Sequence, residues 1–95
     1  MRSPEQVVED ELIRQVRRRG GMVEKMAPIR AGVPDRMVIL NGRTHLVELK
    51  APGGRLRQVQ KVFMSRAAKR GVEVVVLSGV EQVGEWVDSV EKPRP

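Results

Sequence analysis

Two carboxylates and one lysine near the middle of the chain are spaced so that they could act together. Asp35 follows a proline, while Glu48 and Lys50 are separated by a single leucine. The pair Asn41-Gly42 lies midway between them and predicts a two-residue type I′ turn joining two antiparallel strands. With that turn, the pairing register places Asp35 directly opposite Glu48, with Cβ atoms roughly 4.5–5.5 Å apart.

Two carboxylates at this separation repel each other, and like charges in opposed positions destabilise a sheet. A divalent cation would offset the repulsion, because hard cations prefer oxygen ligands. Lys50 lies two residues beyond Glu48 and therefore points to the same face of the strand. The alternative is an ordinary salt bridge between Glu48 and Lys50 on a half-exposed strand, and the matching position of Asp35 favours the metal site.

The strands that carry these residues are expected at 35–40 and 43–50. Both of their faces hold apolar residues, which predicts that much of the hairpin is covered on both sides. The charged residues gather at one end, where Pro34 begins one strand and a proline-containing turn follows the other, as at the mouth of a cleft. His45 falls on the face opposite Glu48 and is interpreted as a packing or surface residue.

A first helix is expected at residues 4–19, because a capping-box pattern begins it and a Gly-Gly pair ends it. The stripe that faces inward consists of Val8, Leu12 and Val16. Glu5 and Glu9 lie on or beside this stripe. Favourable charge in the first turn of the helix explains Glu5 better than Glu9, so Glu9 is the stronger candidate for a functional role.

A second helix is expected at residues 55–70, and Gln60 falls inside its buried arc. Gln60 could bind an active-site group or a metal-bound water, and a glutamine bonded to backbone at the edge of the core is an equal alternative. The other expected elements are a strand at 21–26, a loop at 27–34, a strand at 72–77, a helix at 80–90 and a frayed tail at 91–95. The order αβββαβα predicts one α/β domain over residues 1–95.

The chain carries 18 Lys and Arg against 12 Asp and Glu in 95 residues, a formal net charge of +6. This excess predicts attraction to polyanions, most commonly nucleic acid and more rarely an anionic membrane surface. The absence of cysteine excludes disulfides and thiolate metal sites. Because there is no signal-peptide core and no apolar run of roughly 20 residues, we expect a cytoplasmic location and no membrane partner.

The motif formed by Asp35, Glu48 and Lys50 resembles the core of the PD-(D/E)xK nucleases. A longer set of strings, spread from about Glu5 to Val80, is similar to the VRR-NUC (virus-type replication-repair nuclease) family. These strings are GG at 20–21, GVPDR at 32–36, VELKAPG at 47–53 and LRQVQ at 56–60. The resemblance implies a restriction-endonuclease-like core, in which helices flank a central mixed sheet and a short helix ends the chain.

The resemblance also implies a metal-dependent endonuclease that uses one or two Mg²⁺ or Mn²⁺ ions. Carried over position by position, the metal ligands are Glu9, Asp35, Glu48 and the backbone carbonyl of Leu49. Glu5 is the alternative to Glu9 on the first helix.

Two further residues receive catalytic roles from the same resemblance. Lys50 would orient or activate the attacking water, and Gln60 would position the lysine or the water. The chain departs from the family pattern at Gln58, where proline is usual. This leaves two nearby glutamines, of which Gln60 is favoured by register and by helix face.

The expected partner is DNA, with Lys25, Arg30 and Arg55 as candidate contacts to the phosphate backbone. Since no base-reading module is present, we expect recognition of DNA shape, such as a four-way junction or other branched structure, in replication or repair. Stand-alone relatives of this size imply a phage or bacterial origin and a homodimer. A flap-type or less selective nuclease, and a non-catalytic DNA-binding domain with the same fold, are the alternatives.

Overall fold

The computed structural model describes residues 1–91, with the side chain of Glu91 left out. Its elements are α1 (Pro4–Arg18), β1 (Met22–Lys25), β2 (Arg36–Leu40), β3 (Arg43–Lys50), α2 (Gln58–Ala68), β4 (Val74–Ser78) and α3 (Val80–Glu91). The four strands form one sheet in the order β1-β2-β3-β4. The first two pairings are antiparallel and the pairing of β3 with β4 is parallel. The predicted α/β class and the order αβββαβα are confirmed.

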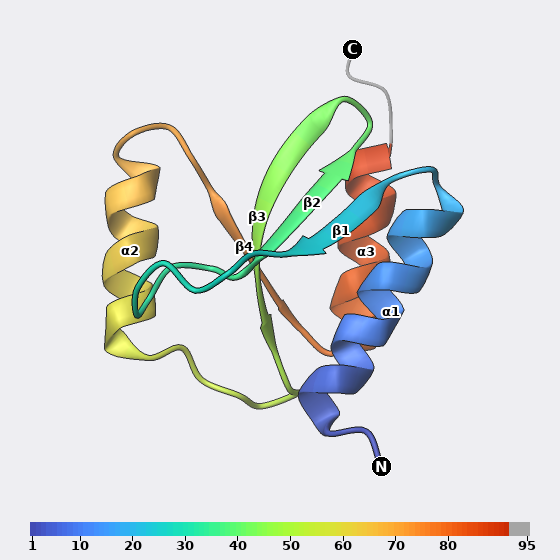
Figure 1. Ribbon diagram of the computed structural model, residues 1–95, viewed down its shortest axis with the longest axis horizontal. Helices are drawn as coiled ribbons and strands as arrows, with labels where there is room; N and C mark the ends of the chain where they lie inside the picture. Colours follow the sequence, from blue (N-terminus) through green and yellow to red (C-terminus); the bar gives the residue numbers. More distant parts are fainter. Residues whose placement is uncertain (92–95) are drawn as a thin grey trace.

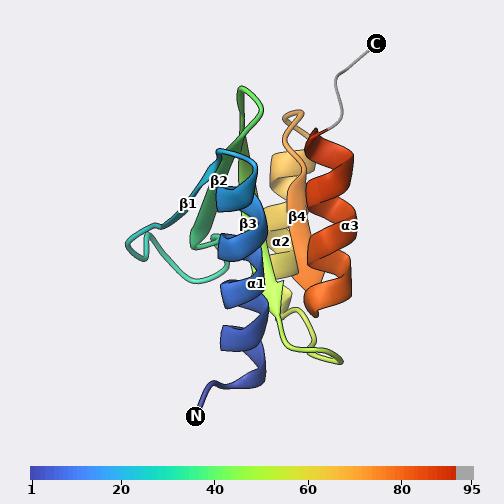
Figure 2. The ribbon, with the colours of Figure 1, turned by 90° about the vertical axis from the view of Figure 1, so that its right-hand side faces the viewer.

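Helices cover both faces of this mixed sheet. Figure 1 shows α2 on one side of the sheet and the pair α1 and α3 on the other. Figure 2, turned by 90°, shows α1 and α3 running alongside each other. No helix within residues 1–91 has the length and apolar character needed to cross a bilayer.

The hairpin between β2 and β3 has the predicted register. Leu40 pairs with Arg43, and four steps further from the turn Arg36 pairs with Val47. Both turn residues, Asn41 and Gly42, have positive φ angles of 55° and 75°, as a type I′ turn requires. Extended by one step, to the residue just before β2, the same register sets Asp35 opposite Glu48.

The principal core lies between the sheet and the pair α1 and α3. Four hairpin side chains with alternating spacing point into it and are at most 3% exposed: Val38, Leu40, Val47 and Leu49. The predicted stripe of α1 packs against them, together with Val83 and Val87 of α3. His45 also lies on this face, with its ring 5.1 Å from the Trp86 ring in an edge-to-face contact. Its interpretation as a packing residue is confirmed.

Both ends of α1 follow from local sequence. The Ser3 hydroxyl accepts a hydrogen bond from the Gln6 backbone N–H, and the Gln6 side chain accepts one from the Ser3 N–H. Gly20 ends the helix at a φ of 80°. Gly21 then passes so close to β2 that a Cβ there would lie 2.7 Å from the Ile39 carbonyl oxygen. Glycine at this position therefore allows α1 to lie directly against the sheet.

The predicted start of the second helix is wrong by three residues. Residues 55–57 stay extended, with Arg57 at φ −75° and ψ 158°, and α2 begins at Gln58. The Gln60 side chain accepts a hydrogen bond of 2.7 Å from the Arg57 backbone N–H and thereby caps the helix at this point.

Smaller differences occur at the other boundaries. The last strand is Val74–Ser78 rather than 72–77, because the ladder with β3 begins at Leu46 and Val74. Glu91, expected in the frayed tail, is the last residue of α3. The remainder of the expected tail, 92–95, lies outside the described residues.

Candidate active site

A pocket of about 310 Å³ lies at the end of the hairpin where Asp35 and Glu48 meet. Four parts of the chain surround it: the first turn of α1, the loop before β2, the end of β3 and the start of α2. The polar and charged residues that line it are Glu5, Arg30, Asp35, Arg36, Glu48, Arg57 and Gln60. Leu49 lines it as well, so the pocket unites most of the residues predicted to do chemistry.

The loop at 27–34 forms one wall of the pocket because it is held against α2. Gly32 has a φ of 93°, and a Cβ there would lie only 2.4 Å from the carbonyl oxygen of Val59. Any other residue would push the loop away from the helix. At the far end of the loop, the Met26 N–H donates a hydrogen bond of 2.8 Å to the Asp35 carbonyl, which fixes the approach to β2.

Glu48 is costly to ionise in the pocket because it is half-buried and lies near other carboxylates. Burial is the main cause that raises the pKa of Glu48 above its ordinary value, and the negative charges of Asp35 and Glu5 add to the rise. The positive charge of Lys50 acts in the opposite direction. A cation among these oxygens would relieve the repulsion, so the donor set suits a hard divalent metal.

The two acidic candidates on α1 lie in different surroundings. Glu9 accepts a hydrogen bond of 2.5 Å from Arg36 Nε, and Arg36 also donates to Asp35 through Nη1. Burial opposes the charge of Arg36, but these two carboxylates outweigh it and raise the guanidinium pKa above its ordinary value. Glu5 lines the pocket and Glu9 does not.

This arrangement bears on the expected metal ligands. Within residues 1–91, no three acidic or histidine side chains are already gathered as a metal site. Asp35, Glu48 and Leu49 line the pocket. Of the two acids on α1, Glu5 lines the pocket with them and Glu9 does not. The role of Glu9 as the ligand from α1 stays a prediction.

Lys50 has no carboxylate within 4 Å in the described part of the chain. The alternative of an ordinary Glu48–Lys50 salt bridge is therefore wrong. The half-buried lysine keeps its donors available at the end of β3. Lys50 is not among the residues that line the pocket, and its role in the chemistry stays a prediction.

Gln60 is bonded to the backbone and also lies at the pocket, so it fits both of the alternatives predicted for it. It is 5% exposed, lines the pocket, and uses Oε1 to accept the Arg57 backbone N–H. Its Nε2 makes no hydrogen bond with any residue in 1–91. The side chain is thus fixed by the backbone while its amide donors remain available at the pocket.

The expected phosphate contacts divide into two groups. Arg30 is exposed, lines the pocket and stands 6.0 Å from the centre of the Phe63 ring. Lys25 and Arg55 are also exposed but lie outside the pocket lining, and their contacts with DNA stay predictions. Arg57 lines the pocket and was not among the favoured contacts. The sequence does contain a signal that could have pointed to Arg57 as a phosphate contact. No acidic residue lies between Glu48 and Glu73, so the cations of this stretch have no nearby acid in the sequence.

The family model for the VRR-NUC domain matches residues 3–81 of this chain. The chain belongs to the VRR-NUC family. A solved structure of a VRR-NUC domain superimposes on the fold with a TM-score of 0.79 and 27% sequence identity, covering 92% of this chain and 97% of that one. The VRR-NUC chain is also 41% identical over 75 residues to "Putative nuclease p44" of Acyrthosiphon pisum secondary endosymbiont phage 1, covering 77% of this chain and 81% of the relative. Family and relative together identify this VRR-NUC protein as a nuclease.

Proposed function

We propose that this nuclease is a metal-dependent DNA endonuclease that cuts branched DNA, including four-way junctions. The observation that carries the proposal is the single pocket that brings together Asp35, Glu48, Leu49 and Gln60. Arg30 and Arg57 at the same pocket supply positive charge for the phosphate backbone.

Asp35, Glu48 and the Leu49 carbonyl would hold one or two Mg²⁺ or Mn²⁺ ions, and Glu5 or Glu9 would add a further carboxylate. When bound, such a metal polarises the scissile phosphate and lowers the pKa of a coordinated water. Burial, with a further contribution from the negative charges of Asp35 and Glu5, raises the pKa of Glu48, and a cation at this position would offset that cost.

The remaining residues act directly on water and phosphate. Lys50 offers unpaired ammonium donors that would orient the attacking water and offset negative charge in the transition state. Gln60 offers its Nε2 to the water or to a phosphate oxygen. Its Oε1 accepts the Arg57 backbone N–H and has a second lone pair, so Gln60 would position either Lys50 or the water.

The reaction is a hydrolysis. The water oxygen attacks phosphorus, the P–O3′ bond breaks, and the proton lost by the water ends on the leaving oxygen. The products are a 5′-phosphate and a 3′-hydroxyl. A homodimer would present two such pockets to the symmetric arms of a junction.

The test is to incubate the pure protein with labelled four-way junction, flap and linear duplex DNA in Mg²⁺, Mn²⁺ or EDTA. Glu48→Gln and Lys50→Ala should each reduce cutting by about 10²-fold or more, because each removes several kcal/mol of transition-state stabilisation. Glu24→Gln is the matched control, since Glu24 is an exposed acid on β1 outside the pocket.

Cutting that requires metal, is lost in both the Glu48 and Lys50 variants and survives in the control would establish the endonuclease. The preferred DNA would then decide between junction resolution and a flap-type or less selective activity. Binding without cutting in any metal would overturn catalysis and leave a DNA-binding domain with this fold.

A further inference from the structure

A second hollow adjoins the pocket and has a different composition. It measures about 200 Å³, and its charged lining consists of Arg30, Arg66 and Arg70, with Phe63 and Ala67 as the apolar part. Arg30 lines both hollows and so connects them. We call these three guanidinium groups the arginine cluster.

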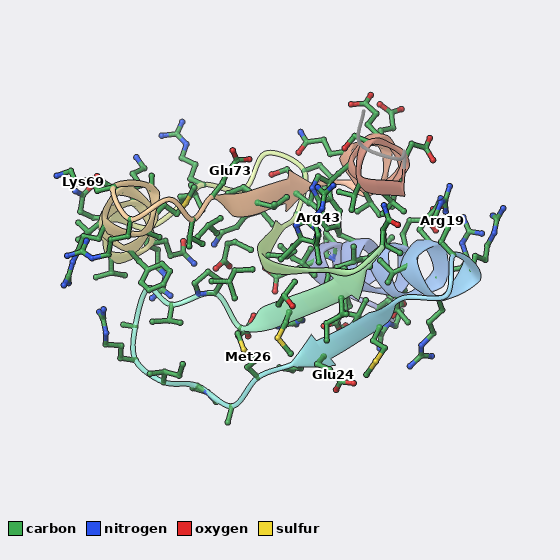
Figure 3. The ribbon with its side chains drawn as sticks, turned by 90° about the horizontal axis from the view of Figure 1, so that it is seen from above. Arg19, Glu24, Met26, Arg43, Lys69 and Glu73 are labelled. Atoms are coloured by element: carbon green, nitrogen blue, oxygen red, sulfur yellow. The ribbon has the colours of Figure 1, made fainter. Side chains whose placement is uncertain are left out.

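The arginine cluster has no counter-charge of its own. Within residues 1–91, no carboxylate lies within 4 Å of Arg30, Arg66 or Arg70. The sequence from 49 to 72 contains no acidic residue that could provide one. Three cations around one hollow repel each other, which favours an anionic occupant. In Figure 3, nitrogen-tipped side chains surround α2, with Lys69 on its outer side.

Favourable interaction with the helix dipole accounts for part of this charge, because Arg66 and Arg70 lie near the C-terminal end of α2. It does not account for Arg30, which reaches the same hollow from the loop before β2. There its guanidinium stands 6.0 Å from the centre of the Phe63 ring, which restricts its position. Guanidinium groups suit phosphodiester oxygens because they bind them through two parallel hydrogen bonds.

We infer that the arginine cluster binds backbone phosphates of the DNA strand that continues beyond the scissile phosphate. This deepens the proposed function and rests on it for the identity of the polyanion. From Gln60 to Arg66 the helix advances about 9 Å along its axis. Along the axis of a B-form duplex, that length corresponds to about three nucleotides of one strand, at 3.4 Å each. The inference therefore assigns the cluster to phosphates about three nucleotides from the cut.

The test compares two double variants that remove the same charge. Arg66→Gln/Arg70→Gln changes the cluster, and Arg17→Gln/Arg18→Gln changes two exposed arginines in the last turn of α1. Figure 3 shows their neighbour Arg19 at the opposite end of the molecule from Lys69. Affinity for a fluorescent four-way junction is measured by anisotropy in EDTA at several salt concentrations, so that the strands stay intact.

We expect the cluster variant to bind about tenfold or more weakly at 0.1 M salt. The slope of log K against log[salt] should fall by about 1–2, since each lost phosphate contact removes about 0.9. The α1 variant should keep the wild-type slope within about 0.5. In wild-type protein, an uncharged methylphosphonate about three nucleotides from the mapped cut position of the junction should weaken binding, and in the cluster variant it should not.

Equal losses in the two double variants, or no loss in the cluster variant, would overturn the inference. So would a wild-type protein that does not bind the junction. The result is separable from the proposed function. Metal-dependent cutting with cluster-independent binding removes only the inference, while cluster-dependent binding without cutting removes only the catalytic proposal.

Discussion

The two faces of the sheet differ in both packing and charge. Under α1 and α3 the contacts are fully buried, with Leu12 and Val47 at 0% exposure. On the α2 side, Gln60 is the residue of that helix which is buried. Stability therefore resides mainly on the α1 and α3 face, because the hydrophobic contribution scales with the apolar area removed from water.

The charges follow the same division. Most of the cations on or against α1 are paired with acids: Arg2 with Asp10, Arg14 with Glu11, Arg19 with Asp88 and Arg36 with Glu9. Within the described chain, Arg17 and Arg18 of α1 and the cations of α2 have no acidic partner. The α1 side thus pairs most of its cations, and α2 leaves its own available to a polyanion. The pocket lies where the two regions meet.

The largest expected effect tests the division in packing. Leu12→Ala should lower the free energy of unfolding by about 2–5 kcal/mol, because it leaves a cavity in the principal core. Val62→Ala on α2 should change it by less than about 0.5 kcal/mol, since Val62 is 47% exposed. Urea unfolding measures both. Similar losses would show that α2 carries as much of the stability as α1 does.

An intermediate effect tests the division in charge. Arg36→Gln should destabilise the protein by about 1–3 kcal/mol, because it removes the partner of Glu9 and Asp35 at a buried position. Arg66→Gln should be close to neutral in the same unfolding measurement, since its guanidinium is exposed and unpaired. A costly Arg66→Gln would mean that the arginine has a structural role instead of an available binding role.

The smallest expected effect is a pH dependence of stability that arises from His45, on the face of the sheet covered by α1 and α3. Burial, with a further contribution from Arg43, lowers the pKa of His45 below its ordinary value of 6.5. The unfolded chain therefore takes up the proton first as the pH falls through 6.5. Stability should decline below that pH until the folded pKa is reached.

His45→Phe removes this titration while keeping a ring against Trp86. Thermal unfolding between pH 8 and pH 5 should show a weaker acid dependence in this variant than in wild type. An unchanged pH dependence would assign the acid sensitivity to other groups.

Much of the fold could be predicted because its signals are local. The Asn41-Gly42 turn fixed the hairpin register, and strand alternation then assigned His45 and Glu48 to opposite faces. The same register accounts for the meeting of Asp35 and Glu48, which is the centre of the candidate site. The capping box at Ser3 placed the start of α1 in the same way.

The start of α2 was harder to predict from the sequence. Helix-forming residues continue through 55–57, and the cap depends on the hydrogen bond that the Arg57 backbone N–H donates to the Gln60 side chain. Helix propensity alone does not reveal that bond, because a local hydrogen bond between a side chain and the backbone competes with continuation of the helix.

The sequence by itself determined which residues share a strand face, since side chains alternate with a period of two. Only the tertiary structure decided which acid of α1 faces the pocket and which one pairs with Arg36. Glu5 and Glu9 are four residues apart and occupy the same side of a helix, so periodicity cannot separate them. The arginine cluster likewise needed the folded chain, because Arg30 and Arg66 come from segments that the sequence keeps far apart.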